Sequence, residues 1–395
     1  MPKTNLLFIV TKLELGGAQK QLFELIQGLA QNKDFKLFLF TSQEGVLLDD
    51  FLKINGLTLR KSKCLERAIN PWKDLWAIIE ICRFIKKNNI KIVHTHSSKA
   101  GVLGRTAAKL AGATCIIHTV HGWPFHQYQP WYLRNLYSFL EKQAAKFSDK
   151  LIVVSHHDKE KGLRHSIGKG SQYHLIRYGI NRNIFYQQPQ TQTVRDEFGL
   201  RAASLLVTNI SCFKPQKSPL DFIRVAGIVL QALPEVKFIL IGDGMLRGRI
   251  EKLIRKLGLQ EKIILPGWRT DIPRILSATD CLVLTSLWEG LPISVLEALA
   301  SGCPVVATDT GGIKEVIREG KNGFLVPPKN TQALAEKLIS LLKDNALRKT
   351  MSESSRNSLE DKFDLRESCA RHQQLYRDLA LSKGIGAASN EYFNN

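Results

Sequence analysis

No apolar run in this 395-residue sequence approaches the roughly 18–20 residues that a membrane-spanning helix needs. The seven cysteines are odd in number and scattered, and they form neither a C-x-x-C pair nor a metal-ligand spacing. A disulfide framework and a zinc module are therefore not expected, and a reducing cytosol is the simplest compartment. Because 44% of the residues are hydrophobic, the chain can bury two cores of ordinary domain size.

Acidic residues are scarce in the first half of the chain. Residues 1–190 contain 28 Lys and Arg against 13 Asp and Glu, a net charge of +15. Residues 191–395 contain 28 against 23, a net charge of +5, and the two parts make up the +20 of the whole chain. This asymmetry predicts an anionic partner for the first half, which the charge alone leaves open as a bilayer surface, lipid phosphate or nucleic acid.

The stretch 285–312, together with the apolar run that precedes it, has the pattern of a strand, a helix and a second strand. The apolar run Cys281–Leu284 predicts a buried parallel strand. A turn follows, with Pro292 expected as the first residue of a helix over Ile293–Ala300, which ends at Gly302. Val305–Ala307 predicts the next strand, so the carboxyl edge of this βαβ unit is where a ligand is expected.

Two carboxylates mark that edge. Glu289 precedes the predicted helix, and Glu297 lies eight positions on, about two helical turns later and hence on a similar face. The free N–H groups of the first helical turn favour a phosphate between them. The arrangement fits a sugar nucleotide. The alternative is that both glutamates are solvent-exposed helix residues that bind no ligand.

Other loops supply glycines and lysines after predicted strands. The strand Leu6–Val10 leads into Gly16-Gly17 and a helix, which favours a phosphate. The spacing lacks G-x-G-x-x-G, and the strand Phe35–Phe40 has no acidic residue at its end, so a redox dinucleotide is not expected. Lys214 and Lys217 follow the strand Leu205–Ile210 and can neutralise a diphosphate. Gly242 ends a third strand, with Arg247 about one turn further on.

Four histidines lie near strand ends, but their spacing lacks the acidic or Cys company of a metal site. His121, just past a strand and before a glycine, is expected to point into the ligand site. His94, His96 and His118 are expected to be core residues.

The segment 123–147 mixes Trp, Tyr and Phe with Arg134, Lys142 and Lys146. Such a helix can lie at a bilayer interface and dock a lipid-borne acceptor. Packing of the same aromatic residues in the core is the alternative, and the sequence leaves both open.

Glu289 and Glu297, with Gly290-Leu291-Pro292 between them and E-A-x-A-x-G-x-P-V-V-A after, resemble the signature of retaining GT-B glycosyltransferases of family 4. The resemblance implies an α/β fold of two facing Rossmann-like domains with a deep interdomain cleft. It also implies that Glu289 and His121 are catalytic and contact the sugar, and that Glu297 holds the ribose. The donor-binding residues would be Gly16, Gly17, Lys214, Lys217, Gly242, Arg247, Gly290, Leu291, Pro292 and Glu297.

The sequence departs from this family pattern at two places. Cys212 stands where the family has an arginine, and Lys214 is the substitute we expect for its charge. Tyr178-Gly179-Ile180-Asn181 stands where the family reads Asn-Gly-Ile-Asp, so roles of that Asn and Asp do not carry over.

The expected domains are 1–186, an acceptor-side Rossmann-like domain; 187–364, the nucleotide-sugar domain; and 365–395, a helix returning to the first domain with a frayed tail. A polar linker is expected at 187–194. The expected activity is transfer of a hexosyl sugar from a nucleotide-sugar donor to an acceptor hydroxyl with retention, without cofactor or metal, in polysaccharide or glycolipid assembly. The expected partners are the donor, a lipid-linked acceptor and an anionic membrane met peripherally at the inner face of the plasma membrane, with no nucleic acid. The alternatives are a sugar-nucleotide epimerase on the same fold and a non-catalytic basic adaptor for membrane or nucleic acid.

Overall fold

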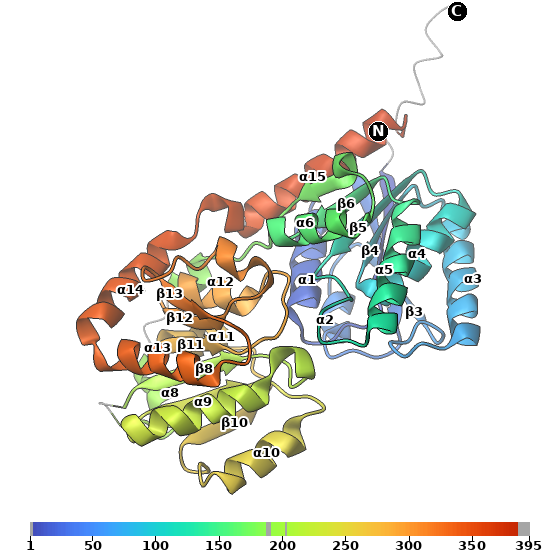
Figure 1. Ribbon diagram of the computed structural model, residues 1–395. Helices are drawn as coiled ribbons and strands as arrows, with labels where there is room; N and C mark the ends of the chain where they lie inside the picture. The colour runs from blue at the N-terminus through green and yellow to red at the C-terminus, as the bar shows by residue number, and fades with distance from the viewer. Residues whose placement is uncertain (1–2, 187–190, 202–203, 386–395) are drawn as a thin grey trace, which may run out of the picture. The chain divides into compact units, whose positions relative to one another are not determined.

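A computed structural model describes residues 3–186, 191–201 and 204–385 of the chain. The chain divides into two compact units, one formed by residues 1–179 and 365–395 and the other by residues 180–364 (Figure 1). Each unit is a parallel sheet with helices on both faces, as the α/β prediction requires.

The sheet of the first unit has seven parallel strands in the order β3-β2-β1-β4-β5-β6-β7. The chain therefore leaves β1 toward one edge and resumes at β4 toward the other, which places a topological switch point between β1 and β4. The strands are β1 (Thr4–Ile9), β2 (Phe35–Ser42), β3 (Leu57–Ser62), β4 (Ile92–His96), β5 (Cys115–Val120), β6 (Lys150–Val153) and β7 (Tyr173–Leu175). The helices are α1 (Gly17–Ala30), α2 (Leu48–Leu52), α3 (Pro71–Lys87), α4 (Ser98–Ala111), α5 (Trp131–Ala145), α6 (His156–Arg164) and α15 (Leu365–Ser382), with the 3-10 turn η1 (Gly170–Gln172).

Alternating side chains of β1 build two core layers in this unit. Leu6 and Phe8 pack with α1, α2 and α15, whereas Leu7 and Ile9 pack with α3 and α4 on the other face. All four side chains are fully buried, because a parallel strand between helical layers is covered on both sides.

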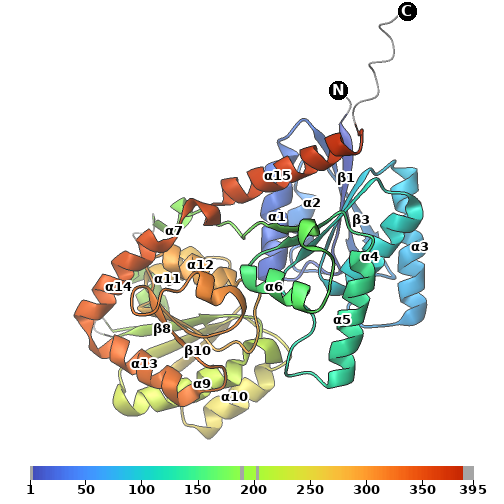
Figure 2. The ribbon, with the colours of Figure 1, turned by 45° about the horizontal axis from the view of Figure 1, so that its top comes forward.

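The helix α15 belongs to the first unit although it lies near the end of the chain. It runs beside α1 (Figure 2). The ring of Tyr376 is fully buried, and its hydroxyl lies 2.7 Å from His94 Nδ1. Arg377 on the same helix forms an ion pair with Asp34, with 2.6 Å between Nη2 and Oδ2.

The sheet of the second unit has six parallel strands in the order β10-β9-β8-β11-β12-β13. Its switch point lies between β8 and β11. The strands are β8 (Leu206–Ile210), β9 (Lys237–Ile241), β10 (Ile263–Gly267), β11 (Cys281–Leu284), β12 (Val305–Thr308) and β13 (Gly323–Val326). The helices are α7 (Asn183–Tyr186), α8 (Thr191–Glu197), α9 (Pro219–Ala232), α10 (Arg247–Lys256), α11 (Ile272–Ser277), α12 (Ile293–Ala300), α13 (Thr331–Lys343) and α14 (Asn345–Ser358), with the 3-10 turns η2 (Pro215–Lys217), η3 (Gly311–Glu315) and η4 (Asp361–Phe363).

The expected linker and the expected C-terminal tail are described only in part. The linker expected at 187–194 is helical from Thr191, where α8 begins, and Val194 is fully buried. The prediction of a linker was wrong there, because a run of polar residues also occurs on the solvent-exposed side of a short helix. Residues 187–190, and residues 386–395 of the expected frayed tail, lie outside the described residues.

Within the described ranges, no helix combines the length and apolar character needed to cross a bilayer.

A buried ion pair joins α4 to α5. Arg105 Nη2 lies 2.5 Å from Glu141 Oε2, and the two side chains are 0% and 2% exposed. The guanidinium also donates from Nε to the carbonyl oxygen of Gly101 at 2.8 Å. Two charges removed from water are stable only as a pair, so each depends on the other.

We therefore expect Glu141→Ala to lower the free energy of unfolding of the first unit by about 3–5 kcal/mol, because Arg105 is left charged and buried. Urea denaturation followed by tryptophan fluorescence measures the loss. Glu44→Ala removes an exposed ion pair with Lys12 and serves as the control, with an expected cost below about 1 kcal/mol. Equal losses for the two variants would contradict the interpretation.

Candidate active site

The site in the second unit forms where β8 and β11 end side by side. Ligands of open parallel sheets bind at the carboxyl ends of the strands beside a switch point. The loop 211–218 leaves β8, and the loop 285–292 leaves β11. Both loops therefore start at the position that the strand order singles out.

Hydrogen bonds join these two loops. Leu287 donates its backbone N–H to the carbonyl oxygen of Gln216 at 2.7 Å, and Gln216 Nε2 donates to the carbonyl oxygen of Trp288 at 2.9 Å. The hydroxyl of Thr285 donates to the carbonyl oxygens of Lys217 and Ser218, each at 3.0 Å. The loops therefore act as one rigid wall, although they are about 70 residues apart in the sequence.

This wall brings Lys217 and Glu289 into contact. Lys217 Nζ lies 2.5 Å from Glu289 Oε1, and the side chains are only 16% and 6% exposed. The sequence predicted both residues as ligand contacts but not their pairing, because nothing in a single sequence links two positions so far apart. The ammonium keeps two further N–H donors that an anion can accept.

The helix α12 starts directly after the Glu289 loop. It covers Ile293–Ala300 as expected, but Pro292 is the residue that precedes the helix and not its first residue. Glu289 therefore lies outside the helix, and the argument that placed it on the same helical face as Glu297 is wrong. No side chain among the described residues caps the helix, and Val295 N–H bonds back to the carbonyl oxygen of Pro292 at 3.2 Å. The N–H groups of Ile293 and Ser294, which precede it, are the ones suited to an anion.

The loop after β12 closes the opposite side of Glu289. Gly311 has φ +58°, and a Cβ added there would lie 2.1 Å from the carbonyl oxygen of Glu289, so a larger residue does not fit. Gly312 donates its N–H to the carbonyl oxygen of Gly290 at 2.7 Å. The backbone of Glu289 and Gly290 is thus held between two loops, with Leu291 and Pro292 buried behind it.

Two hydroxyl residues of this region were missed by sequence reasoning. Ser286 and Thr310 are buried, and their hydroxyl oxygens have no hydrogen-bond partner within the described part of the chain. Ser286 is the second residue after β11 and Thr310 the second after β12, and this position near strand ends was the only signal in the sequence. They are additional candidates for ligand contact.

The remaining predicted residues of this unit differ in their surroundings. Glu297 is buried in the second turn of α12. Gly242 has φ +129°, and a Cβ there would lie 2.0 Å from the carbonyl oxygen of Ser211, so glycine is required. Arg247 pairs with Asp243 at 2.8 Å and with Glu251 at 2.9 Å, so carboxylates already neutralise it. Lys214 is half-buried and makes no ion pair with any described residue, which leaves its charge available.

The first unit carries the other predicted residues at the carboxyl edge of its own sheet. Gly16 precedes α1, and Gly17 is the first residue of that helix. The switch point between β1 and β4 is closed by Thr11 and Ser97, whose hydroxyl oxygens lie 2.7 Å apart. His121 follows β5, as expected.

Both ring nitrogens of His121 have partners. Nδ1 lies 2.5 Å from the hydroxyl oxygen of Tyr178, and Nε2 lies 2.9 Å from Nδ1 of His96. Burial, and to a lesser extent the nearby His372, lowers the pKa of His121 to about 3, so the ring is neutral at physiological pH.

Two of the expected core histidines are fully engaged in the core. His94 bonds through Nε2 to Thr119 Oγ1 at 2.7 Å, in addition to Tyr376. His118 Nδ1 lies 2.9 Å from Thr95 Oγ1. Across the described residues, no three His, Cys, Asp or Glu side chains converge to hold a metal ion.

Comparisons with known proteins agree with this architecture. A family profile described as Glycosyltransferase Family 4 matches residues 15–183, and one described as Glycosyl transferases group 1 matches residues 190–358. The chain is 31% identical over 379 residues to a UDP-Gal:alpha-D-GlcNAc-diphosphoundecaprenol alpha-1,3-galactosyltransferase of Escherichia coli, covering 93% of this chain and 95% of the relative. It is 26% identical to an N-acetyl-alpha-D-glucosaminyl L-malate synthase of Bacillus anthracis, covering 78% and 80%.

Solved structures show the same fold. Anabaena Alr3699/HepE in complex with UDP-glucose matches with a TM-score of 0.82 at 20% identity, covering 95% of this chain and 99% of that one. WaaG, a glycosyltransferase involved in lipopolysaccharide biosynthesis, matches with a TM-score of 0.76 at 17% identity, covering 93% and 99%. The fold and the profiles define a glycosyltransferase with GT-B architecture. The chain belongs to glycosyltransferase family 4, which confirms the resemblance drawn from the Glu289–Ala307 stretch.

The buried histidines predict acid sensitivity. Burial holds the pKa of His94, His96 and His118 well below 6.5, and lowers that of His372 to about 4. In the unfolded chain these four histidines take up protons near pH 6.5, whereas in the folded chain they remain neutral at that pH. The stability from these neutral rings is therefore complete above pH 6.5 and is lost as the pH falls from 6.5 toward 4.

The free energy of unfolding should fall between pH 7.5 and pH 5.5, by up to about 1.4 kcal/mol per pH unit for each histidine below its unfolded pKa. Urea denaturation at pH 7.5, 6.5 and 5.5 measures the slope, and His372→Gln should make it shallower. A free energy of unfolding that stays constant over this range would contradict the prediction.

Proposed function

We propose that this glycosyltransferase moves a hexosyl residue from a nucleotide-diphosphate sugar to an acceptor hydroxyl with retention at the anomeric carbon. The observation that carries the proposal is the Lys217–Glu289 pair, held beside the free N-terminus of α12 at the switch point of the second unit. A cation, free N–H groups and a carboxylate in one place match a diphosphate attached to a sugar.

The residues take roles that follow their chemistry. The diphosphate binds Lys217 and the first turn of α12, with Lys214 in the place of the missing arginine charge. Glu289 accepts hydrogen bonds from the sugar hydroxyls, and Glu297 accepts from the ribose. The loop that begins at Gly242 and leads to Arg247, the first residue of α10, completes the donor site together with Gly290, Leu291 and Pro292. From the first unit, Gly16 and Gly17 serve the phosphates and His121 serves the sugar.

The transfer step needs no covalent intermediate. The bond from the anomeric carbon to the diphosphate oxygen breaks, and the acceptor oxygen forms its bond on the same face of the sugar. The departing diphosphate takes the acceptor's proton. Lys217 and the helix N-terminus stabilise the charge that develops on the diphosphate, so we propose that transfer needs no metal ion.

The names of relatives point to the donor and acceptor to test. HepE was crystallised with UDP and UDP-glucose, and the Escherichia coli relative is named for UDP-Gal and a diphosphoundecaprenol acceptor. We therefore propose a UDP-sugar donor and a lipid-linked acceptor, in polysaccharide or glycolipid assembly. An epimerase would act without an acceptor, and a basic adaptor would not need the donor site, so neither accounts for these relatives as well.

The helix α5 supports work at a membrane surface. Of the aromatic residues in segment 123–147, Trp123 and Phe125 are buried in the core, whereas Trp131, Tyr132 and Phe139 are exposed. Tyr132, Leu136 and Phe139 form an exposed stripe at helical spacing, followed by the exposed Lys142 and Lys146. An apolar stripe beside lysines fits an anionic bilayer at the inner face of the plasma membrane.

Substitutions at the ion pair separate donor binding from turnover. Glu289→Gln should lose most turnover while keeping affinity for UDP, because its proposed contacts are with the sugar. Lys217→Ala should weaken UDP binding by about 1.5–3 kcal/mol, the range for a hydrogen bond to a charged group. Calorimetry with UDP and product formation from UDP-sugars with a polyprenyl-diphosphate sugar acceptor measure the two effects.

The matched control is Lys314→Ala, which removes an exposed lysine bonded to Asp309 in the same unit. It should leave UDP affinity within about twofold of the parent. Parental turnover in Glu289→Gln would refute the role of Glu289, and unchanged UDP affinity in Lys217→Ala would refute the diphosphate site.

The stripe on α5 should carry membrane binding. Replacing Tyr132, Leu136 and Phe139 by serine should release the protein from sedimenting vesicles that contain anionic lipid, because the apolar contact is lost. Serine at Met245 and Leu257, exposed apolar residues of the second unit, should not. Equal recovery of the parent protein in the supernatant with and without anionic lipid would contradict the membrane proposal.

A further inference from the structure

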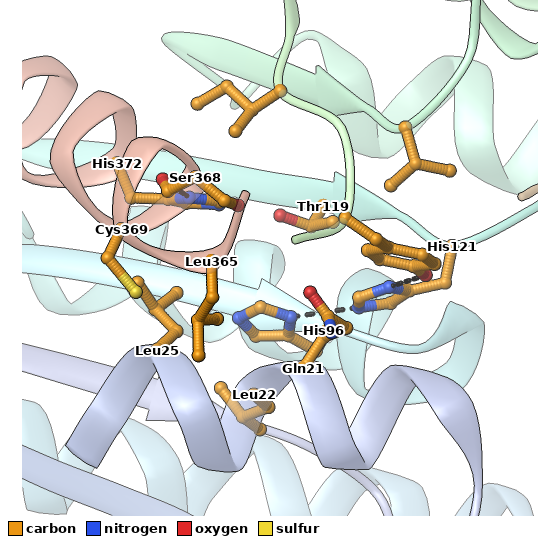
Figure 3. A pocket seen from close by; sticks show the side chains of 13 residues that line it. Gln21, Leu22, Leu25, His96, Thr119, His121, Leu365, Ser368, Cys369 and His372 are labelled. Atoms are coloured by element: carbon orange, nitrogen blue, oxygen red, sulfur yellow. Dashed lines mark hydrogen bonds between the residues drawn. The ribbon is translucent and has the colours of Figure 1, made fainter. Parts of the chain in front are cut away.

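Three side chains of the first unit form a hydrogen-bonded chain that the proposed transfer does not explain. Tyr178 contacts His121. His121 in turn contacts His96 (Figure 3). The residues come from the segment after β7, the end of β5 and the end of β4. Tyr178 and His96 are buried, and the rings of His96 and His121 stack with 5.2 Å between centroids.

The distances favour one placement of the protons in this chain. The separation of 2.5 Å between the Tyr178 oxygen and His121 Nδ1 is at the short end of the range for O–H donors and below the range for N–H donors to oxygen. Tyr178 therefore donates to Nδ1, which must be unprotonated. A neutral imidazole carries its one proton on the other nitrogen, so His121 Nε2 donates to His96 Nδ1 over 2.9 Å.

The same reasoning continues to His96. Since its Nδ1 accepts, its proton is on Nε2, which is buried and has no hydrogen-bond partner among the described protein atoms. The ring lines a cavity of about 20 Å³, together with Gln21, Thr119, Ser368 and His372. This volume suffices for one water molecule, which can accept a hydrogen bond from Nε2–H.

We propose that His96 and Tyr178 are positioning residues that hold the neutral ring of His121 in its Nε2–H tautomer, so that Nδ1 is the atom it offers to a sugar hydroxyl. The inference rests on the proposed role of His121 in transfer. It has a consequence for recognition: a sugar hydroxyl that binds Nδ1 takes the place of the Tyr178 hydroxyl and must donate its proton. Tyr178 satisfies the nitrogen until then, which gives a reason for tyrosine where the family pattern has asparagine.

The first test reads the tautomer directly and needs no substrate. Long-range proton–nitrogen NMR of the full chain, with His121 assigned by His121→Gln, should show a protonated Nε2 and an unprotonated Nδ1. In His96→Leu the acceptor for Nε2 is lost, and the protonated nitrogen should become Nδ1, which can donate to the Tyr178 oxygen. In His96→Asn the amide oxygen can replace Nδ1 of His96, and the Nε2–H form should persist.

The second test reads turnover. His96→Leu should lower kcat roughly tenfold to hundredfold, the range seen for loss of a group that orients a metal-ligating histidine, with UDP affinity unchanged because His96 is not among the proposed UDP contacts. His96→Asn should restore kcat to within about threefold of the parent. Tyr173→Phe, which removes a buried hydroxyl bonded to the carbonyl of Ile167, is the control for packing and should leave the tautomer unchanged.

The outcomes separate this inference from the proposed function. A protonated Nδ1 in the parent protein, or equal kcat in His96→Leu and the parent, would overturn the positioning role. If His121→Ala turns over at the parental rate while the tautomer is as assigned, the role of His121 in transfer is refuted instead. The NMR result stands even if a variant folds poorly, because it is measured first on the parent chain.

Discussion

The hydrogen bonds between the loops after β8 and β11 are the constraint on which the proposed donor site depends. They run between backbone and side-chain groups of 216–218 and 285–288, so they fix the loops before any ligand arrives. As a consequence, Lys217 and Glu289 are held as a largely buried ion pair that carries no net charge. A preorganised cation beside a helix N-terminus does not have to be rearranged to meet a developing negative charge.

The first unit is organised around a different kind of polar core. Five of its histidines are kept neutral by burial: His94 and His96 of β4, His118 of β5, His121 just after β5, and His372 of α15. Their hydrogen bonds connect three separate chain segments through Tyr178, Thr119 and Tyr376. The carboxyl edges of the two sheets thus differ in their polar groups. The second unit has an ion pair there, and the first unit has uncharged histidines.

Much of this fold could be read from the sequence because buried parallel strands are continuous apolar runs. Cys281–Leu284 and Leu6–Val10 were placed within a residue or two of β11 and β1. The contact between Lys217 and Glu289, and that between His96 and His121, could not be predicted, because each depends on which strands become neighbours. The shared face of Glu289 and Glu297 was wrong, since the helical period applies only after Pro292. Which aromatic residues of segment 123–147 are buried and which are exposed could not be predicted, because helical spacing alone does not say which face of α5 meets the sheet.

The position of α15 bears on how the polypeptide matures during synthesis. Leu375, Tyr376 and Leu379 complete the core that β1 and α1 begin, yet they are translated more than 340 residues later. The second unit is one uninterrupted segment, 180–364, so it can emerge from the ribosome and close its core while the first is still missing a helix. The half of the protein that is made first is therefore the half that is finished last.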